Sequence, residues 1–496
     1  MGPLSNVFAT PSPGYPSRRD FLRRTGSGIG LLALADLAEE AETRAVQANP
    51  GSPNALINPL DPMSPRAPHF QAKAKSVIWL FLNGGPSQVD TWDYKPELAR
   101  RNGQELQGFD QKTGFFAGAA GPLMASPFRF ERRGASGTWV PEIFPMIASH
   151  VDDMAFIHSC FTDTNNHSPA LFQMNTGMSR MGFPGVGSWV TYGLGSESRN
   201  LPGFVVMYDT KGRGLPKGNA SNWGAGFLPG VFQGTALNPQ GAPIDNLSPL
   251  SSMNDDRQRA QLDFLKRLNR RNQSLNPEET ALSARIESFE LAYRMQMTAP
   301  EAIDVENESE PTRQLYGLDR PECGHFARQC LIARRLVERG VRFVQIYSGG
   351  MENERSWDGH TDIAKNHRGF AAETDRPIAA LLTDLKSRGL IDSTLVVCNG
   401  EFGRLPLVQK GGTGRDHNPH AFTTWFAGGG IKGGVHHGET DEIGHKAAVN
   451  RVSVNDLHAT ILRLLGLDHT RLTYRFNGRD FRLTDVAGNV VSPIIG

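Results

Sequence analysis

Residues 394–430 read TLVVCNGEFGRLPLVQKGGTGRDHNPHAFTTWFAGGG, which is two short apolar runs around a polar loop. The runs Thr394–Cys398 and Phe422–Ala427 are β-branched or aromatic and bounded by Gly or Asn, as buried strands are. Ligands in open α/β sheets bind at the carboxyl ends of strands, so a polar loop here predicts a metal site or acid–base chemistry. The alternative is a solvated loop with a few ion pairs. The loop carries Glu401, Arg404, Asp416, His417 and His420.

Working outward, further segments repeat this pattern. Ser76–Leu82 is a near-continuous apolar run, which is typical of a strand buried on both faces of a parallel sheet. Similar strands are predicted at Met154–His158, Phe204–Met207 and Phe343–Tyr347. Helices are predicted at Phe326–Arg339, at Pro377–Arg388 with Pro in the first turn, and at Leu457–Leu465. The alternation predicts an α/β fold, a mostly parallel sheet sandwiched by helices.

The stretch 255–296 differs, because it is rich in Arg, Gln and Glu and is interrupted at Asn276-Pro277. It predicts two exposed helices, followed by an acidic loop at Glu301–Glu310. We therefore expect residues of about 210–315 to form an insertion or cap on one domain of residues 71–496.

The N-terminus has the pattern of an export signal. Residues 17–23, SRRDFLR, resemble a twin-arginine motif, and Val46-Gln47-Ala48 is a small-residue cleavage site. The apolar segment Ile29–Leu37 between them is far shorter than the roughly 20 residues needed to span a bilayer. We expect residues 1–48 to be a signal region read by the twin-arginine export machinery, residues 49–70 to be a linker, and the protein to be periplasmic or otherwise exported.

Charge and cysteine content exclude other classes. The 52 basic and 51 acidic residues nearly cancel, without a basic run, so neither nucleic acid nor an anionic membrane is expected as a partner. The four cysteines form no CxxC pair, and we predict no disulfide framework.

TLVVCNGEFG resembles a strand of the alkaline phosphatase and sulfatase superfamily, in which an apolar run leads to Ser-Asp-His/Asn-Gly. In that match Glu401 stands at the metal-binding Asp, and Phe402 replaces His or Asn. His417 lies eleven residues before Gly428, the spacing of a late metal-binding His in that superfamily. Trp357-Asp358-Gly359-His360 resembles its Asp/His metal pair.

Two further segments extend the resemblance. Residues 167–177 resemble the segment that begins at the superfamily's nucleophile, with His167 in the nucleophile's place. The closer match is an exported family of uncharacterised function, which shares Gly-Gly-Pro-Ser…Asp-Thr-Trp-Asp, Glu-Phe-Gly-Arg and Gly-Arg-Asp-His. These motifs occur here at Gly84–Asp93, Glu401–Arg404 and Gly414–His417.

The resemblance implies a divalent metal. Asp358 and His360 are two residues apart, so extended backbone would place both on one face, where His417 could complete a three-ligand set. Carboxylate and imidazole suit zinc, with manganese or iron as alternatives. The match places Asn83 and Glu401 at a second metal position, where Asp90, Asp93 or His167 could supply a missing ligand.

The remaining assignments concern the substrate. His167 is a nucleophile, a metal ligand or a core residue. Arg404 and Arg415 either hold a phosphate or sulfate oxygen or form ion pairs with Glu401 or Asp416. We assign catalysis to His167 and Arg404, and substrate binding to Ser87, Asp90, Arg415, Asp416 and His420.

Two functions follow. The first is an exported metal-dependent hydrolase of phosphate or sulfate esters, with a small-molecule or glycan ester as substrate. The second is a catalytically degenerate superfamily member that binds an exported glycan or partner protein. Asp358, His360 and His417 favour the first, whereas Asn83 and Phe402 favour the second.

Overall fold

The computed structural model describes residues 61–239, 244, 254–275, 280–351 and 353–496. The predicted signal region and most of the linker lie outside these residues. The chain divides into two compact units, one of residues 1–50 and 255–279 and one of residues 51–254 and 280–496. Helix α6 (Asp255–Leu275) belongs to the first unit, and every element described below belongs to the second.

The second unit is organised around a nine-stranded sheet, in the order β14-β5-β13-β9-β1-β8-β6-β7, with β17 also paired to β5. Strand β1 runs parallel to both of its neighbours, and only β13 is antiparallel to the strands beside it. All of the predicted strands are present. The bounds are β1 Ser76–Leu82, β5 Met154–Phe161, β6 Phe204–Met207, β7 Thr235–Ala236, β8 Phe343–Ser348, β9 Thr394–Asn399, β13 Phe422–Ala427, β14 Val435–His437 and β17 Val452–Ser453.

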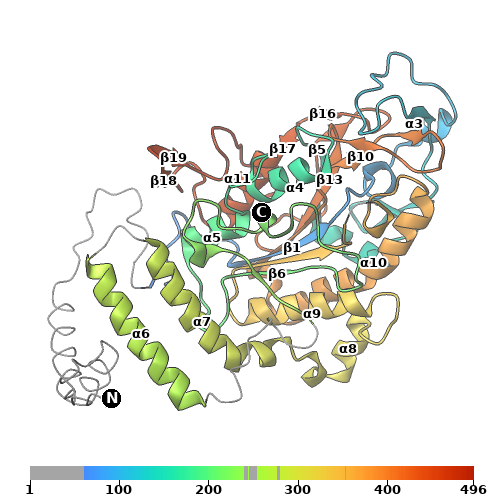
Figure 1. Cartoon of the computed structure of the whole chain (residues 1–496). Helices are drawn as coiled ribbons and strands as arrows, with labels where there is room; N and C mark the ends of the chain where they lie inside the picture. The colour runs from blue at the N-terminus through green and yellow to red at the C-terminus, as the bar shows by residue number, and fades with distance from the viewer. Residues whose placement is uncertain (1–60, 240–243, 245–253, 276–279, 352) are drawn as a thin grey trace, which may run out of the picture. The chain divides into compact units, whose positions relative to one another are not determined.

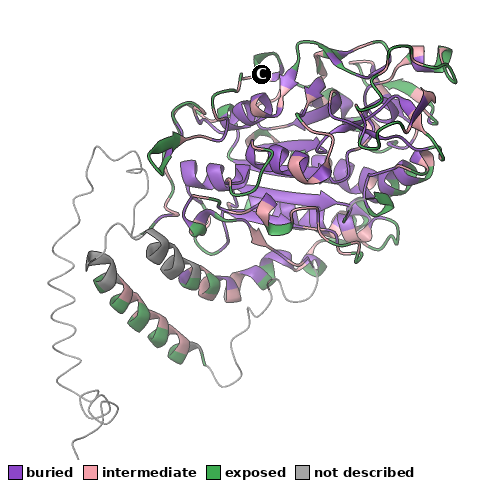
Figure 2. Ribbon diagram, turned by 45° about the horizontal axis from the view of Figure 1, so that its top comes forward, coloured by how far each residue is buried: buried purple, intermediate pink, exposed green. Residues whose placement is uncertain are grey.

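Helices cover both faces of this sheet, as Figure 1 shows. Alternate side chains of β1 enter two different cores, because successive residues of a strand point to opposite faces. The core on one face includes side chains of α7 (Thr280–Ile303), α8 (Glu310–Tyr316), α9 (Gly324–Glu338) and α10 (Ile363–Ser387). The core on the other face includes side chains of α4 (His167–Thr176), α5 (Val186–Leu194) and α11 (Val454–Leu464). Figure 2 shows the central strands buried between them, which is the predicted α/β sandwich.

Short two-stranded sheets lie in the segments that connect the main strands and helices. The pair β10–β12 lies in the loop between β9 and β13, and it places Arg404 opposite His417. The bounds of these strands are β2 Ala120–Leu123, β3 Phe130–Arg133, β4 Thr138–Pro141, β10 Gly403–Arg404, β11 Leu407–Gln409, β12 His417–Asn418, β15 Glu439–Thr440, β16 Ala447–Val449, β18 Tyr474–Phe476 and β19 Arg479–Phe481.

The helix bounds correct two predictions. Helix α10 begins at Ile363, so Pro377 lies inside it rather than in its first turn. Helix α7 continues to Ile303, into the predicted acidic loop. The predicted break at Asn276-Pro277 lies outside the described residues. In the described part of the chain, none of the helices is both long and apolar enough to cross a membrane.

Candidate metal centre

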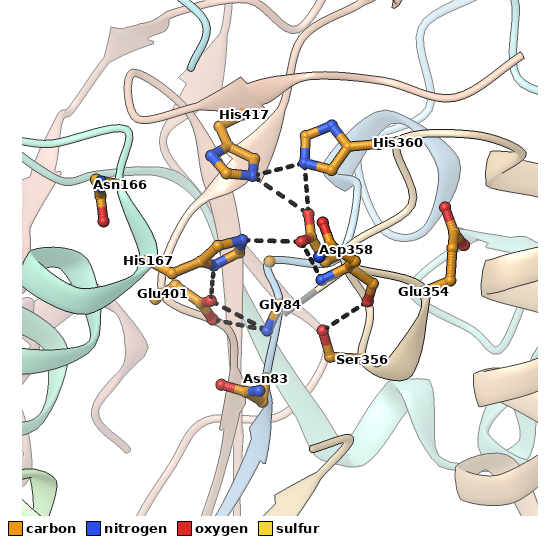
Figure 3. Close-up of polar contacts among 12 residues, drawn as sticks. Asn83, Gly84, Asn166, His167, Glu354, Ser356, Asp358, His360, Glu401 and His417 are labelled. Atoms are coloured by element: carbon orange, nitrogen blue, oxygen red, sulfur yellow. Dashed lines mark hydrogen bonds and ion pairs between the residues drawn. The ribbon is translucent and has the colours of Figure 1, made fainter. Parts of the chain in front are cut away.

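The candidate site lies where several parallel strands end. Strands β1, β5, β8 and β9 point the same way, so the segments that follow them meet at one edge of the sheet. Figure 3 shows three imidazole rings directed toward one carboxylate, that of Asp358. The residues brought to this edge are Asn83 after β1, His167 after β5, Asp358 and His360 after β8, Glu401 after β9, and His417 of β12.

Three atoms of this cluster form a small triangle. Asp358 Oδ1 lies 2.8 Å from His360 Nε2 and 3.2 Å from His417 Nε2, and the two nitrogens are 3.0 Å apart. Ligands of a tetrahedral zinc ion at roughly 2.0–2.1 Å are separated from one another by about 3.3 Å. The three atoms therefore have the mutual spacing of ligands on one ion.

The tautomers of the two rings reinforce this fit. His417 Nδ1 lies 2.6 Å from the carbonyl oxygen of Asn165, which can only accept, so Nδ1 carries the proton. His360 Nδ1 is likewise 2.6 Å from Gln409 Oε1. Burial, followed by the charge of His167, holds the pKa of His417 well below its usual range, so its ring is neutral. The Nε2 lone pairs thus face each other and a carboxylate oxygen, an arrangement that a cation between them would stabilise.

Asp358 is buried and ionised. Burial alone would raise its pKa, but the charge of Arg404, followed by the contact with His167, holds the pKa well below its usual range. Arg404 Nη2 is 2.6 Å from Asp358 Oδ1, and the same guanidinium donates to the carbonyl oxygens of Gly84, Gly85 and Arg415. Arg404 is fully buried. It therefore pairs with Asp358 rather than with Glu401 or Asp416, the pairs that the sequence offered as the alternative to an anion-binding role.

His167 lies between two carboxylates. Its Nδ1 is 2.6 Å from Glu401 Oε1, and Glu401 also accepts from the Gly84 N–H at 3.0 Å. Its Nε2 is 3.1 Å from Asp358 Oδ2 but lacks hydrogen-bond geometry. Burial lowers the pKa of His167, but the contacts with Asp358 and Glu401 raise the pKa to about 9. His167 also forms a possible ligand group with Asp358 and His417, whose donor atoms lie within 4.8 Å of one another.

The second metal position of the resemblance is only partly filled. Asn83 Nδ2 donates to the Gly350 carbonyl, while its buried Oδ1 has no hydrogen-bond partner among the described residues. The Phe402 ring packs on His167 and His417, with centroid separations of 4.9 and 4.5 Å. Phe402 therefore supplies an apolar wall where the superfamily has a ligand.

Three residues assigned to substrate binding form a separate buried network. Arg415 is fully buried and contacts both oxygens of Asp90, at 2.6 and 3.1 Å, and Ser87 Oγ donates to Asp90 at 2.5 Å. Burial raises the pKa of Asp90, but Arg415 lowers it below its usual value. These contacts differ from the substrate-binding role assigned to Arg415. Its guanidinium forms an ion pair with Asp90, and not with Asp416 or a substrate.

The other two assigned residues differ from each other. Asp416 accepts from the Phe116 N–H at 2.9 Å and from the His417 N–H at 2.7 Å, so it anchors a neighbouring loop. It also forms a second possible ligand group with His360 and His417. The His420 ring lies beside His445, with centroids 6.0 Å apart. Its backbone N–H donates to Asn418 Oδ1, so in the described part of the chain its contacts lie outside the triangle.

Four residues of the site were not predicted. Gln409 and Asn165 orient the imidazoles of His360 and His417, and Phe115 and Phe116 lie against those same rings. The only sequence signal was the paired aromatic residues in the Gly-rich segment 114–121.

Comparison with known proteins gives a family and distant structural likenesses. The profile of a family described as "Protein of unknown function (DUF1501)" matches residues 74–495. No curated protein matches the sequence. Among solved structures, the phosphonate monoester hydrolase SpPMH from Silicibacter pomeroyi has 10% identity and a TM-score of 0.34, covering 79% of this chain and 73% of that chain.

Two other solved structures have similar values. The PsFucS1 sulfatase from Pseudoalteromonas sp. has 13% identity and a TM-score of 0.34, covering 82% of this chain and 74% of that one. The alkaline phosphatase of the Antarctic bacterium TAB5 has 11% identity and a TM-score of 0.32, covering 80% and 99%. At this level of likeness, the reaction has to be argued from the residues of the chain itself.

Proposed function

Because this chain belongs to the DUF1501 family, whose description names no reaction, we propose its function from the site: an exported, metal-dependent hydrolase of phosphate or sulfate esters. The substrate is a small-molecule or glycan ester. The twin-arginine pattern of residues 17–23 supports export to the periplasm or beyond.

The observation that carries the proposal is the triangle of Asp358 Oδ1, His360 Nε2 and His417 Nε2, with separations of 2.8 to 3.2 Å. The two imidazoles turn their protonated Nδ1 atoms outward, to Asn165 and Gln409, and their lone pairs inward. Asp358, His360 and His417 would hold a divalent metal, zinc or alternatively manganese or iron, which would supply Lewis acidity and lower the pKa of water at the site to about 7.

The residues around the triangle would supply proton transfer and hold the Asp358 carboxylate in position. His167 is oriented by Glu401 through Nδ1, which leaves Nε2 on the side of Asp358 to hold or release a proton. Arg404 keeps the Asp358 carboxylate in place through its contact with Oδ1. Water is the nucleophile in this proposal, since none of the described side chains in contact with Asp358 carries a hydroxyl or thiol.

The test is metal content with and without one ligand. Wild-type chain purified in metal-replete medium should carry one divalent ion per chain and hydrolyse phosphate or sulfate monoesters. His360→Ala should lose most of the metal, because two remaining ligands hold a transition ion poorly against water. Elemental analysis measures the content, and release of phosphate or sulfate measures turnover.

The matched control is His437→Ala, on the edge strand β14 and outside both possible ligand groups. Its metal content should equal that of wild type. A wild-type chain without metal would refute the proposal, and equal metal in wild type and His360→Ala would refute this placement of the site.

A second function is a binding protein without turnover. The observation favouring it is that Arg404 and Arg415 are both fully buried in ion pairs with Asp358 and Asp90, so neither is left for an ester anion. Full metal occupancy with no hydrolysis across a panel of phosphate and sulfate esters would favour this function over the first.

A further inference from the structure

Two aromatic side chains lie on the exposed edge of the metal centre. Phe115 and Phe116 leave 46% and 43% of their surface exposed, although Phe is a residue that folding normally buries. Their rings meet edge to face, with centroids 5.1 Å apart and planes at 89°. They therefore form a small apolar surface with two ring orientations.

This surface touches the metal-facing imidazoles directly. The Phe115 ring centroid is 5.4 Å from that of His417, and the Phe116 centroid is 5.2 Å from that of His360. His360 is the one residue of the triangle that is not fully buried; its side chain is 12% exposed, against 1% for Asp358 and 2% for His417. The most exposed member of the triangle is therefore His360, the ring against which Phe116 lies.

The backbone under the rings is held by residues of the site. Asp416 accepts from the Phe116 N–H at 2.9 Å. The Asn165 side chain donates to the carbonyls of Thr113 and Gly114 at 3.1 and 2.8 Å, while its own carbonyl accepts from His417. A Cβ at Gly114 would lie 2.3 Å from Asp416 Oδ2, so the close approach requires glycine. Asn165 and Asp416 therefore hold both His417 and the backbone that carries the two rings.

We propose that Phe115 and Phe116 form a ring-binding platform, so that the esters taken by this site carry a ring with an apolar face, either a pyranose or an aryl group. This inference rests on the proposed function, since the metal would hold the ester anion while the ring stacks on the aromatic pair. Aromatic faces bind such rings by dispersion and by the attraction of polarised C–H groups to the π-system.

The test compares three phosphonates on the full, metal-loaded chain by isothermal titration calorimetry. Phosphonates keep the anion but contain no ester bond to hydrolyse. The probes are methylphosphonate, phenylphosphonate and a C-glucosyl methylphosphonate. Wild type should bind at least one ring-bearing probe about five- to tenfold more tightly than methylphosphonate, the range of one or two stacking contacts. The ring that gains more identifies the natural group as aryl or sugar.

Phe115→Ala/Phe116→Ala should bind methylphosphonate as wild type does and lose the preference for a ring. Retained methylphosphonate affinity also shows that the variant is folded with its metal in place. The matched control is Phe289→Ala, which removes a comparably exposed ring on α7 and should keep the preference.

Two outcomes overturn the platform and leave the hydrolase intact. One is equal affinity of wild type for all three probes, and the other is a preference for rings that survives in the double variant. If no probe binds, the platform is also refuted, and metal content and ester hydrolysis then decide the proposed function separately.

Discussion

Arg404 is the side chain on which the geometry of the cluster depends. It is fully buried and distributes its donors among Asp358 Oδ1 and three backbone carbonyls. The planar fork of a guanidinium can reach such a set, whereas the compact ammonium of lysine cannot. Arg404→Lys should therefore lower the free energy of unfolding by about 2–4 kcal/mol, because a buried pair is broken and carbonyls lose their donors. Urea denaturation measures this.

The control for that loss is Arg133→Lys. The Arg133–Glu131 pair is exposed, at 53% and 66%, so the change should alter the free energy of unfolding by less than about 0.5 kcal/mol. Equal losses in the two variants would show that Arg404 is replaceable and that Asp358 is positioned by the imidazoles alone.

For single residues, the spacing in the sequence could predict only contacts between residues that are close along the chain. The two-residue interval correctly suggested that Asp358 and His360 share a face, since their side chains lie 2.8 Å apart. Nothing in the sequence could show that Asn165 and Gln409 orient the rings, because each comes from a connection far along the chain. The pairing of Arg415 with Asp90, 325 residues apart, was hidden for the same reason.

Helix α10 is joined to its surroundings by several buried carboxylates, of which Glu373 has three basic partners. Its oxygens contact Arg213 at 2.8 and 3.1 Å, Lys211 at 3.0 Å and His325 of α9 at 3.2 Å. Burial alone would raise its pKa, but the bonds from His325 and Arg213 lower the pKa from 4.5 to about 2. Glu373 therefore links α10 to α9 and to the loop after β6 more strongly when it is ionised.

The pH dependence follows from the sign of this shift. A carboxyl whose folded pKa is depressed adds stability that is fully present above the unfolded pKa, here 4.5, and is lost as pH falls toward 2. At pH 7, Glu373→Gln should lower the free energy of unfolding by about 2–3 kcal/mol, allowing for partial solvent screening. The deficit should shrink by about half or more between pH 5 and pH 3.

Chemical denaturation at a series of pH values measures the deficit for Glu373→Gln. Glu439→Gln, at an exposed position of β15, serves as the control and should show little deficit at any pH. A Glu373→Gln deficit that stays constant down to pH 3 would mean that the charge of Glu373 does not stabilise the fold.

Secondary-structure elements were predicted well where the sequence has a clear apolar pattern. They were predicted poorly where a residue such as proline can either begin a helix or lie inside one. The strands β1 and β6 have the predicted bounds, because buried strands of a parallel sheet have continuous apolar runs. The antiparallel strand β13 also has its predicted bounds, and all of its residues are buried. Pro377 was taken as a helix start, but α10 tolerates it in its interior, where burial against the core offsets the lost hydrogen bond. The actual N-cap is Asp362, whose side chain accepts from the Lys365 N–H at 3.0 Å.

The second unit has properties that suit a chain folded before the export that we propose. Its cysteines are buried and free, so the described residues need no oxidising compartment to form a disulfide. These are Cys160, Cys323, Cys330 and Cys398. Two large cores on either face of the sheet supply the packing instead. Folding and metal loading in the cytoplasm are therefore compatible with this structure, and both suit the twin-arginine route that we propose.

That route gives the prediction for the whole molecule. Arg18→Lys/Arg19→Lys keeps both positive charges, so a loss of export would reflect recognition of the arginine pair and not a change in net charge. The double variant should accumulate in the cytoplasm with the metal content and melting temperature of the exported protein, because the signal region plays no part in the folded unit that we propose. Cell fractionation with immunoblotting locates the chain, and elemental analysis and calorimetry compare the purified products.

Arg23→Lys, just outside the pair, is the matched control and should be exported. Normal export of the double variant would refute the twin-arginine assignment, whereas a retained but metal-free product would show that the metal is acquired only after export.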